Sequence, residues 1–383
     1  MSKAILILGG SGNTGEKIAR LLLDNTDVRI ILGARNKEKL RKTAENLKEP
    51  ERVTLTLADA SDPHSLSAAF SGMDMVLSAA STAEFTENVA SACIKAGCDY
   101  LDVQYSNTKV SILKSMTADI EKSGQCFISE AGFHPGLPAA LVRYADTQMD
   151  ILESAITAGA ISANWDDATI TESTKREFVR ELGNYKMEFL KNGDWKKPGF
   201  WSMRDFPAID FGNPVGKKMC VPMFFEELRN LPQMIPSLKH TGFYIAGFGW
   251  FADYVVMPLV LLMMKWFPKT MEKPMGNLFV WAWKLSSKPP YYTMLKLEAN
   301  GEIQGEKTSF YMTLNHEDGY WFTAIPVVAC LLQYLDGSIR KPGLHWMGQL
   351  VEPIRLIEDM EKMGILVSYE AHEETRNNTV IVK

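Results

Sequence analysis

The sequence lacks the motifs of several enzyme classes. Its 383 residues include five cysteines with no CxxC pair, and neither an HExxH motif nor a GxSxG elbow occurs. We therefore expect no metal centre and no serine hydrolase. Scattered cysteines are typical of a reducing compartment, and the apolar run at residues 4–8 is too short for a signal peptide, so we expect a cytoplasmic protein.

The sequence also lacks an excess of basic residues, with 41 lysines and arginines against 46 aspartates and glutamates. The formal net charge is −5, whereas a surface that binds nucleic acid needs an excess of lysine and arginine. The charge balance therefore excludes nucleic acid as the main partner and leaves a small-molecule substrate.

No charge-free apolar run is long enough to span a membrane. The longest apolar stretch, residues 243–267, is interrupted by Asp253 and Pro258, and a charge at bilayer depth is costly. We expect this stretch to be buried in a second domain or in a homodimer interface, while a peripheral membrane contact and a true span remain open as alternatives. Its aromatic and methionine side chains would also suit an apolar ligand channel, which favours a lipid-like substrate over a highly charged one.

A glycine-rich turn stands near the N-terminus. Residues 4–8 predict a buried parallel strand, and apolar residues recur at helical spacing from Glu16 onward. Between them lies GGSGNTG, a variant of the dinucleotide-binding fingerprint, in which the first helix points unpaired amides at a diphosphate. The residues expected to hold that diphosphate are Gly9, Ser11, Gly12, Asn13, Thr14 and Gly15.

The second predicted strand, residues 28–32, leads into Gly33, Ala34 and Arg35 without an acidic residue at its end. Folds that prefer NAD place an acid there to bind the ribose 2′-hydroxyl, whereas a guanidinium can pair with a 2′-phosphate. We therefore expect Ala34 and Arg35 to contact NADP(H). A solvated surface arginine is the alternative.

Four further strands complete a doubly wound sheet, at residues 52–57, 74–78, 100–103 and 126–129, with a helix at 87–96. Asp59 and Ala60 follow the third strand and would lie beside the adenine, although Asp59 could equally cap the next helix. Ala79, Ala80 and Ser81 follow the fourth strand, where small residues suit a dinucleotide lying across the switch point of the sheet.

The second half of the chain has a different pattern. Strands are predicted at residues 151–162, 291–299 and 307–314, helices at 322–335 and 351–363, and a terminal strand pair at 365–369 and 379–382. Consecutive strands without helices between them indicate an antiparallel sheet.

Several stretches together resemble the saccharopine dehydrogenase-like family of oxidoreductases. They are ILGGSGNTG near the N-terminus, SACIKAGCDYLDVQY at residues 91–105, SEAGFHPGLPAALVRYA at 129–145, GYWFTA at 319–324 and LVEPIRLIEDMEKMGI at 350–365. The resemblance implies a doubly wound, NADP-binding Rossmann domain formed by residues 1–134 and about 325–383. It also implies a second α+β domain at about 135–324, built on a mainly antiparallel sheet, for substrate binding and dimerisation.

Candidate catalytic residues stand after the fifth and sixth predicted strands: Asp102, Tyr105 and His134. The ordinary pKa of histidine suits acid–base chemistry, although His134 could instead be a turn residue bonded to the backbone. By resemblance, Asp102 matches an aspartate that lines the family's active-site cleft, and His134 stands where relatives commonly have aspartate. Asp102 could also cap a helix or brace a loop.

These features predict an NADP(H)-dependent oxidoreductase. The hydride would pass to or from a C=N, C=O or C=C bond of an unidentified small molecule. Two alternatives stay open: a redox sensor or regulator that binds NADP(H) without turnover, and a membrane-associated lipid or enoyl reductase.

Overall fold

The structure is a computed structural model that describes residues 2–164, 172–199, 206–249 and 251–373. The chain divides into two compact units. The first comprises residues up to Ala140 together with Tyr320–Met363, and the second comprises Leu141–Gly319 together with the residues from Gly364 onward.

The first unit is built on a seven-stranded parallel sheet in the order β15-β6-β5-β4-β1-β2-β3. Its strands are β1 (Ala4–Leu8), β2 (Arg29–Ala34), β3 (Val53–Leu57), β4 (Met75–Ser78), β5 (Asp99–Asp102), β6 (Cys126–Ser129) and β15 (Gly343–Trp346). The five residues of β1 are all buried, as expected for a central strand covered on both faces. The predicted fold class is confirmed.

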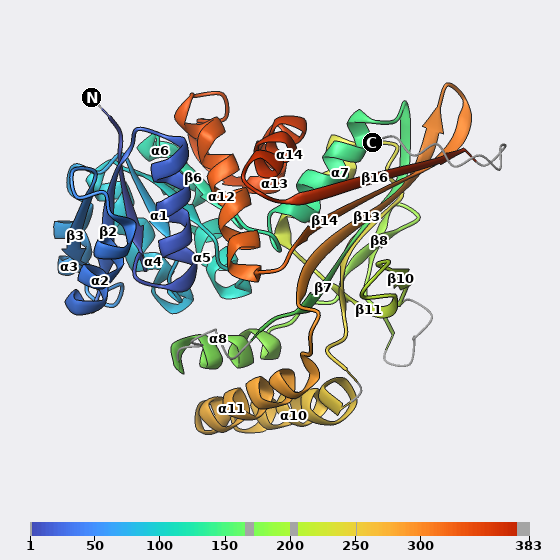
Figure 1. The fold of residues 1–383 in the computed structure, drawn as a ribbon, viewed down its shortest axis with the longest axis horizontal. Coiled ribbons are helices and arrows are strands. Elements are labelled where there is room, and N and C mark those ends of the chain that lie inside the picture. The colour runs from blue at the N-terminus through green and yellow to red at the C-terminus, as the bar shows by residue number, and fades with distance from the viewer. Residues whose placement is uncertain (1, 165–171, 200–205, 250, 374–383) are drawn as a thin grey trace. The chain divides into compact units, whose positions relative to one another are not determined.

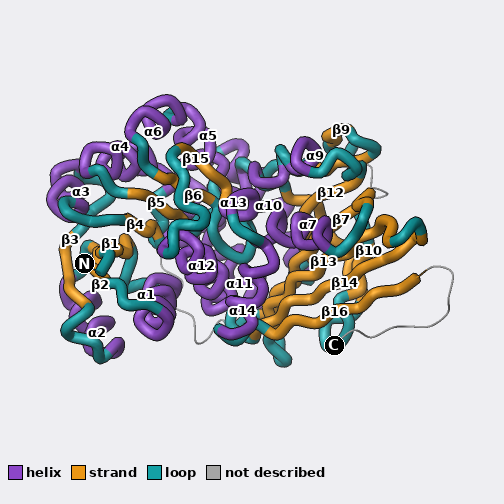
Figure 2. The backbone as a smooth tube through the Cα atoms, turned by 90° about the horizontal axis from the view of Figure 1, so that it is seen from above, coloured by secondary structure: helices purple, strands orange, loops and turns teal. Residues whose placement is uncertain are grey.

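Helices cover both faces of this sheet. They are α1 (Asn13–Asn25), α2 (Lys37–Leu47), α3 (Pro63–Phe70), α4 (Thr86–Ala96), α5 (Asn107–Ser115), α6 (Thr117–Ser123), α12 (Gly319–Leu335), α13 (Met347–Leu350) and α14 (Pro353–Lys362). Figure 2 shows α1, α2 and α12 on one side of the strands and α3 to α6 on the other. In the strand order, β1 lies between β2 and β4. The carboxyl ends of β1 and β4 therefore meet at the switch point where doubly wound sheets bind ligands.

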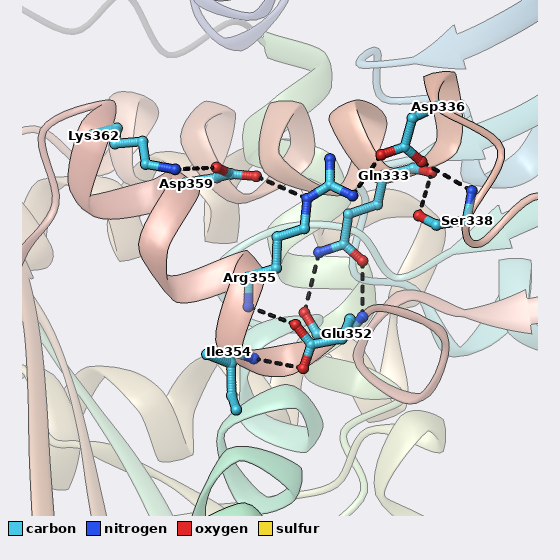
Figure 3. Close-up of polar contacts among 8 residues, drawn as sticks. All are labelled: Gln333, Asp336, Ser338, Glu352, Ile354, Arg355, Asp359 and Lys362. Carbon is cyan, nitrogen blue, oxygen red and sulfur yellow. Dashed lines mark hydrogen bonds and ion pairs between the residues drawn. The ribbon is translucent and has the colours of Figure 1, made fainter.

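A polar network joins α12 to α14 (Figure 3). The fully buried amide of Gln333 donates to the Glu352 carbonyl over 3.1 Å and accepts from the Glu352 amide over 2.8 Å. The Glu352 carboxylate caps α14 by accepting from the amides of Ile354 and Arg355. Arg355 in turn pairs with Asp336. The LVEPIR stretch therefore fixes the start of α14.

The second unit is built on a mainly antiparallel sheet in the order β10-β11-β12-β7-β13-β14-β16; outside this order, β8 pairs with β12 and β9 pairs with β8. The strands are β7 (Ile151–Ser162), β8 (Phe189–Lys191), β9 (Asp194–Lys196), β10 (Ala208–Asp210), β11 (Lys217–Met223), β12 (His240–Ala246), β13 (Tyr292–Ile303), β14 (Glu306–His316) and β16 (Leu366–Glu373). Among the described strands of this sheet, β12 and β7 pair in parallel and the other pairs are antiparallel. The helices are α7 (Leu137–Thr147), which crosses the unit boundary, α8 (Glu172–Gly183), α9 (Leu231–Met234), α10 (Met257–Trp266) and α11 (Pro268–Ser286).

One prediction about the strands is wrong. The strand after Gly364 pairs with β14 of the second sheet, so residues 364–373 belong to the second unit and do not return to the first. The predicted strand at 379–382, and with it the predicted pairing to 365–369, lies outside the described residues. Sequence pattern identifies a strand but not which sheet edge it joins. A seventh parallel strand, β15, was not predicted, because it is a short edge strand without an apolar run.

The apolar stretch at residues 243–267 is divided among several elements. It begins in β12, continues through a π-helical turn at Ala252–Val256 and ends in α10. Within the described part of the chain, no helix combines the length and the apolarity that a bilayer crossing requires. Burial within the second unit is confirmed for one side of α10, which contributes Val260 and Met264 to a core with α8 and α11. The opposite side is exposed.

Candidate functional site

The glycine turn after β1 is closely packed at two of its glycines. Gly9 has a φ of +89°, and a Cβ placed on it would lie 2.8 Å from the Cβ of Ala80. A Cβ on Gly15 would collide with the carbonyl oxygen of Gly9. Only glycine satisfies both positions, so the turn, the start of α1 and the segment after β4 lie in direct contact.

Gly12 serves a different purpose in the same turn. It is the N-cap of α1 and has an extended backbone with φ −90°, and no side chain caps the helix. A Cβ on Gly12 would approach only the Gly9 carbonyl oxygen, at 3.2 Å. A longer side chain would therefore project into the space in front of the first-turn amides, which have no acceptor within a helix. We call the first-turn amides of α1 and the open space beside Gly12 the cradle. Together they fit the diphosphate of a dinucleotide.

Arg35 follows the last residue of β2 and is exposed. The nearest acid on the neighbouring strand end, Asp59, is held by its own loop: its carboxylate accepts from the amide of Ser61 over 3.0 Å and from the Ser61 hydroxyl over 2.8 Å. These bonds, with a smaller effect of Arg35, keep the pKa of Asp59 below its ordinary value. The alternative prediction, that Asp59 caps the next helix, is wrong, because Asp62 is the residue that caps α3. An arginine without an acid at this strand end fits a ribose 2′-phosphate.

Small residues line the end of β4, as predicted. Ala79 and Ala80 are half-buried, Ser81 is exposed, and the Ala79 amide donates to the carbonyl of Leu8 over 2.8 Å. Ala60, after β3, is buried, and its carbonyl accepts from the Asn88 side chain.

A buried polar cluster lies at the carboxyl ends of β5 and β6. Asp102 and Lys109 form an ion pair in which each side chain is 1% exposed. The other carboxylate oxygen of Asp102 accepts from the Ser129 hydroxyl over 2.8 Å, and Lys109 also donates to the Gln104 carbonyl. Asp102 does not cap α5, because that role belongs to Ser106. The aspartate therefore braces the loop between β5 and α5.

Tyr105 lies in that braced loop. It is half-buried, and its hydroxyl oxygen accepts from the Asn107 side chain over 3.0 Å. Asn107 is the first residue of α5, so the start of the helix and the loop orient the phenol together.

His134 belongs to a compact turn after β6. Burial lowers the pKa of His134 to about 3, so the ring is neutral at physiological pH. Its neighbour Phe133 stacks on Phe322 of α12, with ring centroids 4.9 Å apart. Gly136 has a φ of +121°, and a Cβ there would lie 2.6 Å from the Gly132 carbonyl oxygen. The turn therefore presents a fixed, uncharged imidazole.

Lys109 and Ser129 are not among the predicted site residues. A signal for Lys109 was present: it occupies the buried side of a short amphipathic helix together with Val110 and Leu113. A lysine at an apolar position of such a pattern indicates a buried partner of opposite charge. Across the described ranges, no group of three or more histidine, cysteine, aspartate or glutamate side chains could hold a metal ion.

Comparison with known proteins gives concordant results. Residues 5–125 match the family model of the saccharopine dehydrogenase NADP binding domain. The chain is 26% identical to carboxynorspermidine synthase of Vibrio cholerae over 412 aligned positions, which cover 93% of this chain and 94% of that protein. It is 29% identical over 150 positions to the "probable mitochondrial saccharopine dehydrogenase-like oxidoreductase" of Arabidopsis thaliana, covering 36% of this chain and 33% of that one.

A solved structure matches nearly the whole chain. Apo saccharopine dehydrogenase (L-Glu forming) from Saccharomyces cerevisiae superposes with a TM-score of 0.65 at 16% identity, over 97% of this chain and all of that one. At that identity the match establishes a common fold.

Proposed function

We propose that the chain is a saccharopine dehydrogenase-like oxidoreductase, because its first domain matches the saccharopine dehydrogenase NADP binding domain and 93% of the chain aligns with a carboxynorspermidine synthase. In this proposal it transfers a hydride to or from a C=N, C=O or C=C bond of a small molecule. When bound, NADP(H) supplies or accepts the hydride, and the protein has to supply orientation and a proton. The observation that carries the proposal is the polar cluster at the carboxyl ends of β5 and β6, at the edge of the sheet where dinucleotides bind.

The glycine turn and Arg35 would hold the cofactor. The amides at the start of α1 would bind the diphosphate, with Gly12 leaving room for it. Arg35 would pair with the 2′-phosphate, because Asp59 is already bound by Ser61.

Tyr105 is the proposed proton carrier. His134 is neutral because burial depresses its pKa to about 3, which leaves it unsuited to donate a proton near neutral pH, and Asp102 is engaged by Lys109 and Ser129. Asn107 donates to the Tyr105 oxygen, which favours release of the phenolic proton. In this proposal His134 orients the substrate by hydrogen bonding, and Asp102 is a positioning residue for the Tyr105 loop.

The relatives suggest which substrates to try first. A carboxynorspermidine synthase and a saccharopine dehydrogenase (L-Glu forming) are both named for amine-containing compounds. We therefore place imines formed from amino acids or polyamines first, and apolar aldehydes and enals second.

Isotope transfer tests the proposal even though the substrate is unidentified. The protein is incubated with a cell extract of small molecules and NADPH that carries deuterium at the nicotinamide C4, and products are analysed by mass spectrometry. We expect deuterium in a specific product with the wild type and none with Gly12→Val. With Tyr105→Phe we expect the rate of deuterium transfer to fall by a factor of about 100 or more. Binding of NADPH without deuterium transfer to any product would overturn the proposal and favour a regulator.

A further inference from the structure

Helices α8, α10 and α11 form a small bundle with its own core within the second unit. Val179 of α8, Val256 and Val260 at α10, and Phe279 and Ala282 of α11 pack together in that core. Figure 1 shows α10 and α11 running side by side, with α8 next to them. The bundle thus buries one side of α10 and of α11 and leaves the other side outward.

The outward side is apolar on both helices. On α10 and the turn before it, the exposed residues Val255, Leu259, Leu262 and Trp266 recur at intervals of four, three and four residues. On α11 the exposed residues Pro274, Trp281 and Leu285 follow at intervals of seven and four residues. Trp266 is 68% exposed and Trp281 is 51% exposed. Phe251, which is exposed and stands four residues before Val255, extends the first stripe. Its ring centroid lies 6.0 Å from that of Trp281, so the two stripes meet. We call this surface, with Phe267, the hairpin face.

The hairpin face is bordered by positive charge. Residues 251–290 contain five lysines and two acids, a net charge of +3, whereas the whole chain carries −5. The five lysines, all exposed, are Lys265, Lys269, Lys273, Lys284 and Lys288. Both acids are engaged within the protein, since Asp253 accepts from two backbone amides of the preceding turn and Glu272 pairs with Arg180.

We propose that the hairpin face binds peripherally to a lipid bilayer that contains anionic lipids. Exposed Trp, Phe and Leu on one side of a helix with lysines at its borders are the combination that inserts to the depth of the headgroups. The lysines would pair with anionic headgroups, which attract basic segments close to the bilayer surface.

The same charges disfavour a second copy of the chain on this face. A two-fold interface brings the same patch of each copy together, so the lysine borders would face one another, and like charges across an interface are unfavourable. Lysine is also depleted from protein–protein interfaces.

Vesicle flotation of the full chain tests the proposal. Wild-type protein is mixed with vesicles of phosphatidylcholine alone or with about 30% phosphatidylserine, enough to give the surface the negative potential that attracts lysines. We expect it to float with the anionic vesicles and to be released by high salt. We also expect Trp266→Ser/Trp281→Ser and Lys265→Glu/Lys269→Glu each to lower the partition coefficient about tenfold or more.

Matched substitutions control for general effects. Leu366 is as exposed as Trp266, and Lys217 and Lys218 are exposed on β11. We expect Leu366→Ser and Lys217→Glu/Lys218→Glu to bind vesicles like the wild type, and all variants to keep the wild-type thermal midpoint.

Failure of the wild type to float with anionic vesicles would overturn the proposal. So would a dimer in sedimentation that the two tryptophan substitutions dissociate, because a second copy would then cover the face. Deuterium transfer from NADPH is measured without lipid, so its result tests the proposed hydride transfer independently of membrane binding.

Discussion

The side-chain ammonium of Lys109 forms an ion pair with the carboxylate of Asp102 in a position where each side chain is 1% exposed. Ser129 and the amide of Glu130 donate to the same carboxylate. One buried charge on β5 thus ties together the start of α5 and the end of β6, the segments that carry Tyr105 and lead to His134.

Removing one partner of this pair should destabilise the first domain. Lys109→Met leaves the Asp102 carboxylate buried without a counter-charge, and we expect a loss of about 3–5 kcal/mol in the free energy of unfolding. Urea denaturation of the wild type and of Lys109→Met measures this loss. The double variant Lys109→Met/Asp102→Asn should recover part of that loss, because no buried charge remains. A single variant that loses less than about 1 kcal/mol would contradict the assignment of a tight buried pair.

Arg35 should determine the preference for NADP(H). We expect Arg35→Ala to weaken NADPH binding by about 1.5–3 kcal/mol, the worth of a charge-assisted hydrogen bond, and to leave NADH binding unchanged. Isothermal titration calorimetry gives both values. Arg41→Ala is the matched control, since Arg41 is an exposed arginine of α2 that pairs with Glu38 and Glu45. Equal affinity of the wild type for NADPH and NADH would refute the role of Arg35.

Gly12 and Gly9 should fail in different ways when substituted. Gly12 has a φ that any residue adopts, so we expect Gly12→Val to fold normally and to lose both NADPH and NADH, because the side chain fills the cradle. Gly9→Ala forces a Cβ into Ala80 at a φ of +89°, so its thermal midpoint should fall as well. Calorimetry and thermal unfolding separate the two effects. Retained binding by Gly12→Val would place the diphosphate elsewhere.

His134 should make stability depend on pH in the acid range. Its folded pKa of about 3 lies below the unfolded value near 6.5, so between these values the unfolded state binds more protons. Stability is therefore greatest above pH 6.5 and falls as the pH is lowered toward 3, by at most about 1.4 kcal/mol per pH unit from this residue.

Substitution isolates that contribution. Urea unfolding of the wild type and His134→Gln at pH 4.5 and 6.5 should show a smaller loss at low pH for the variant. An NMR titration that finds His134 protonating near pH 6.5 would show that the ring is not held neutral by burial.

Local patterns in the sequence were sufficient to identify six of the seven strands of the NADP-binding sheet and the glycine turn that follows the first of them. The predicted strands at 4–8 and 126–129 match β1 and β6 to the residue, because a central parallel strand is buried on both faces and must be continuously apolar. The turn glycines were recognisable for the same reason, since a backbone at positive φ or in close contact accepts no other residue. By contrast, the edge strand β15 has one neighbour and no such pattern.

What the sequence by itself determined is therefore the alternation of strands and helices, the glycine cradle and the arginine that follows β2, each encoded within a few consecutive residues. Only the tertiary structure decided that Asp102 is neutralised by Lys109, that His134 is uncharged, that the strand after Gly364 joins β14, and that one side of the α10–α11 hairpin is exposed. Burial, pKa shifts and edge pairing depend on which distant segments come together, and periodicity along the chain does not carry that information.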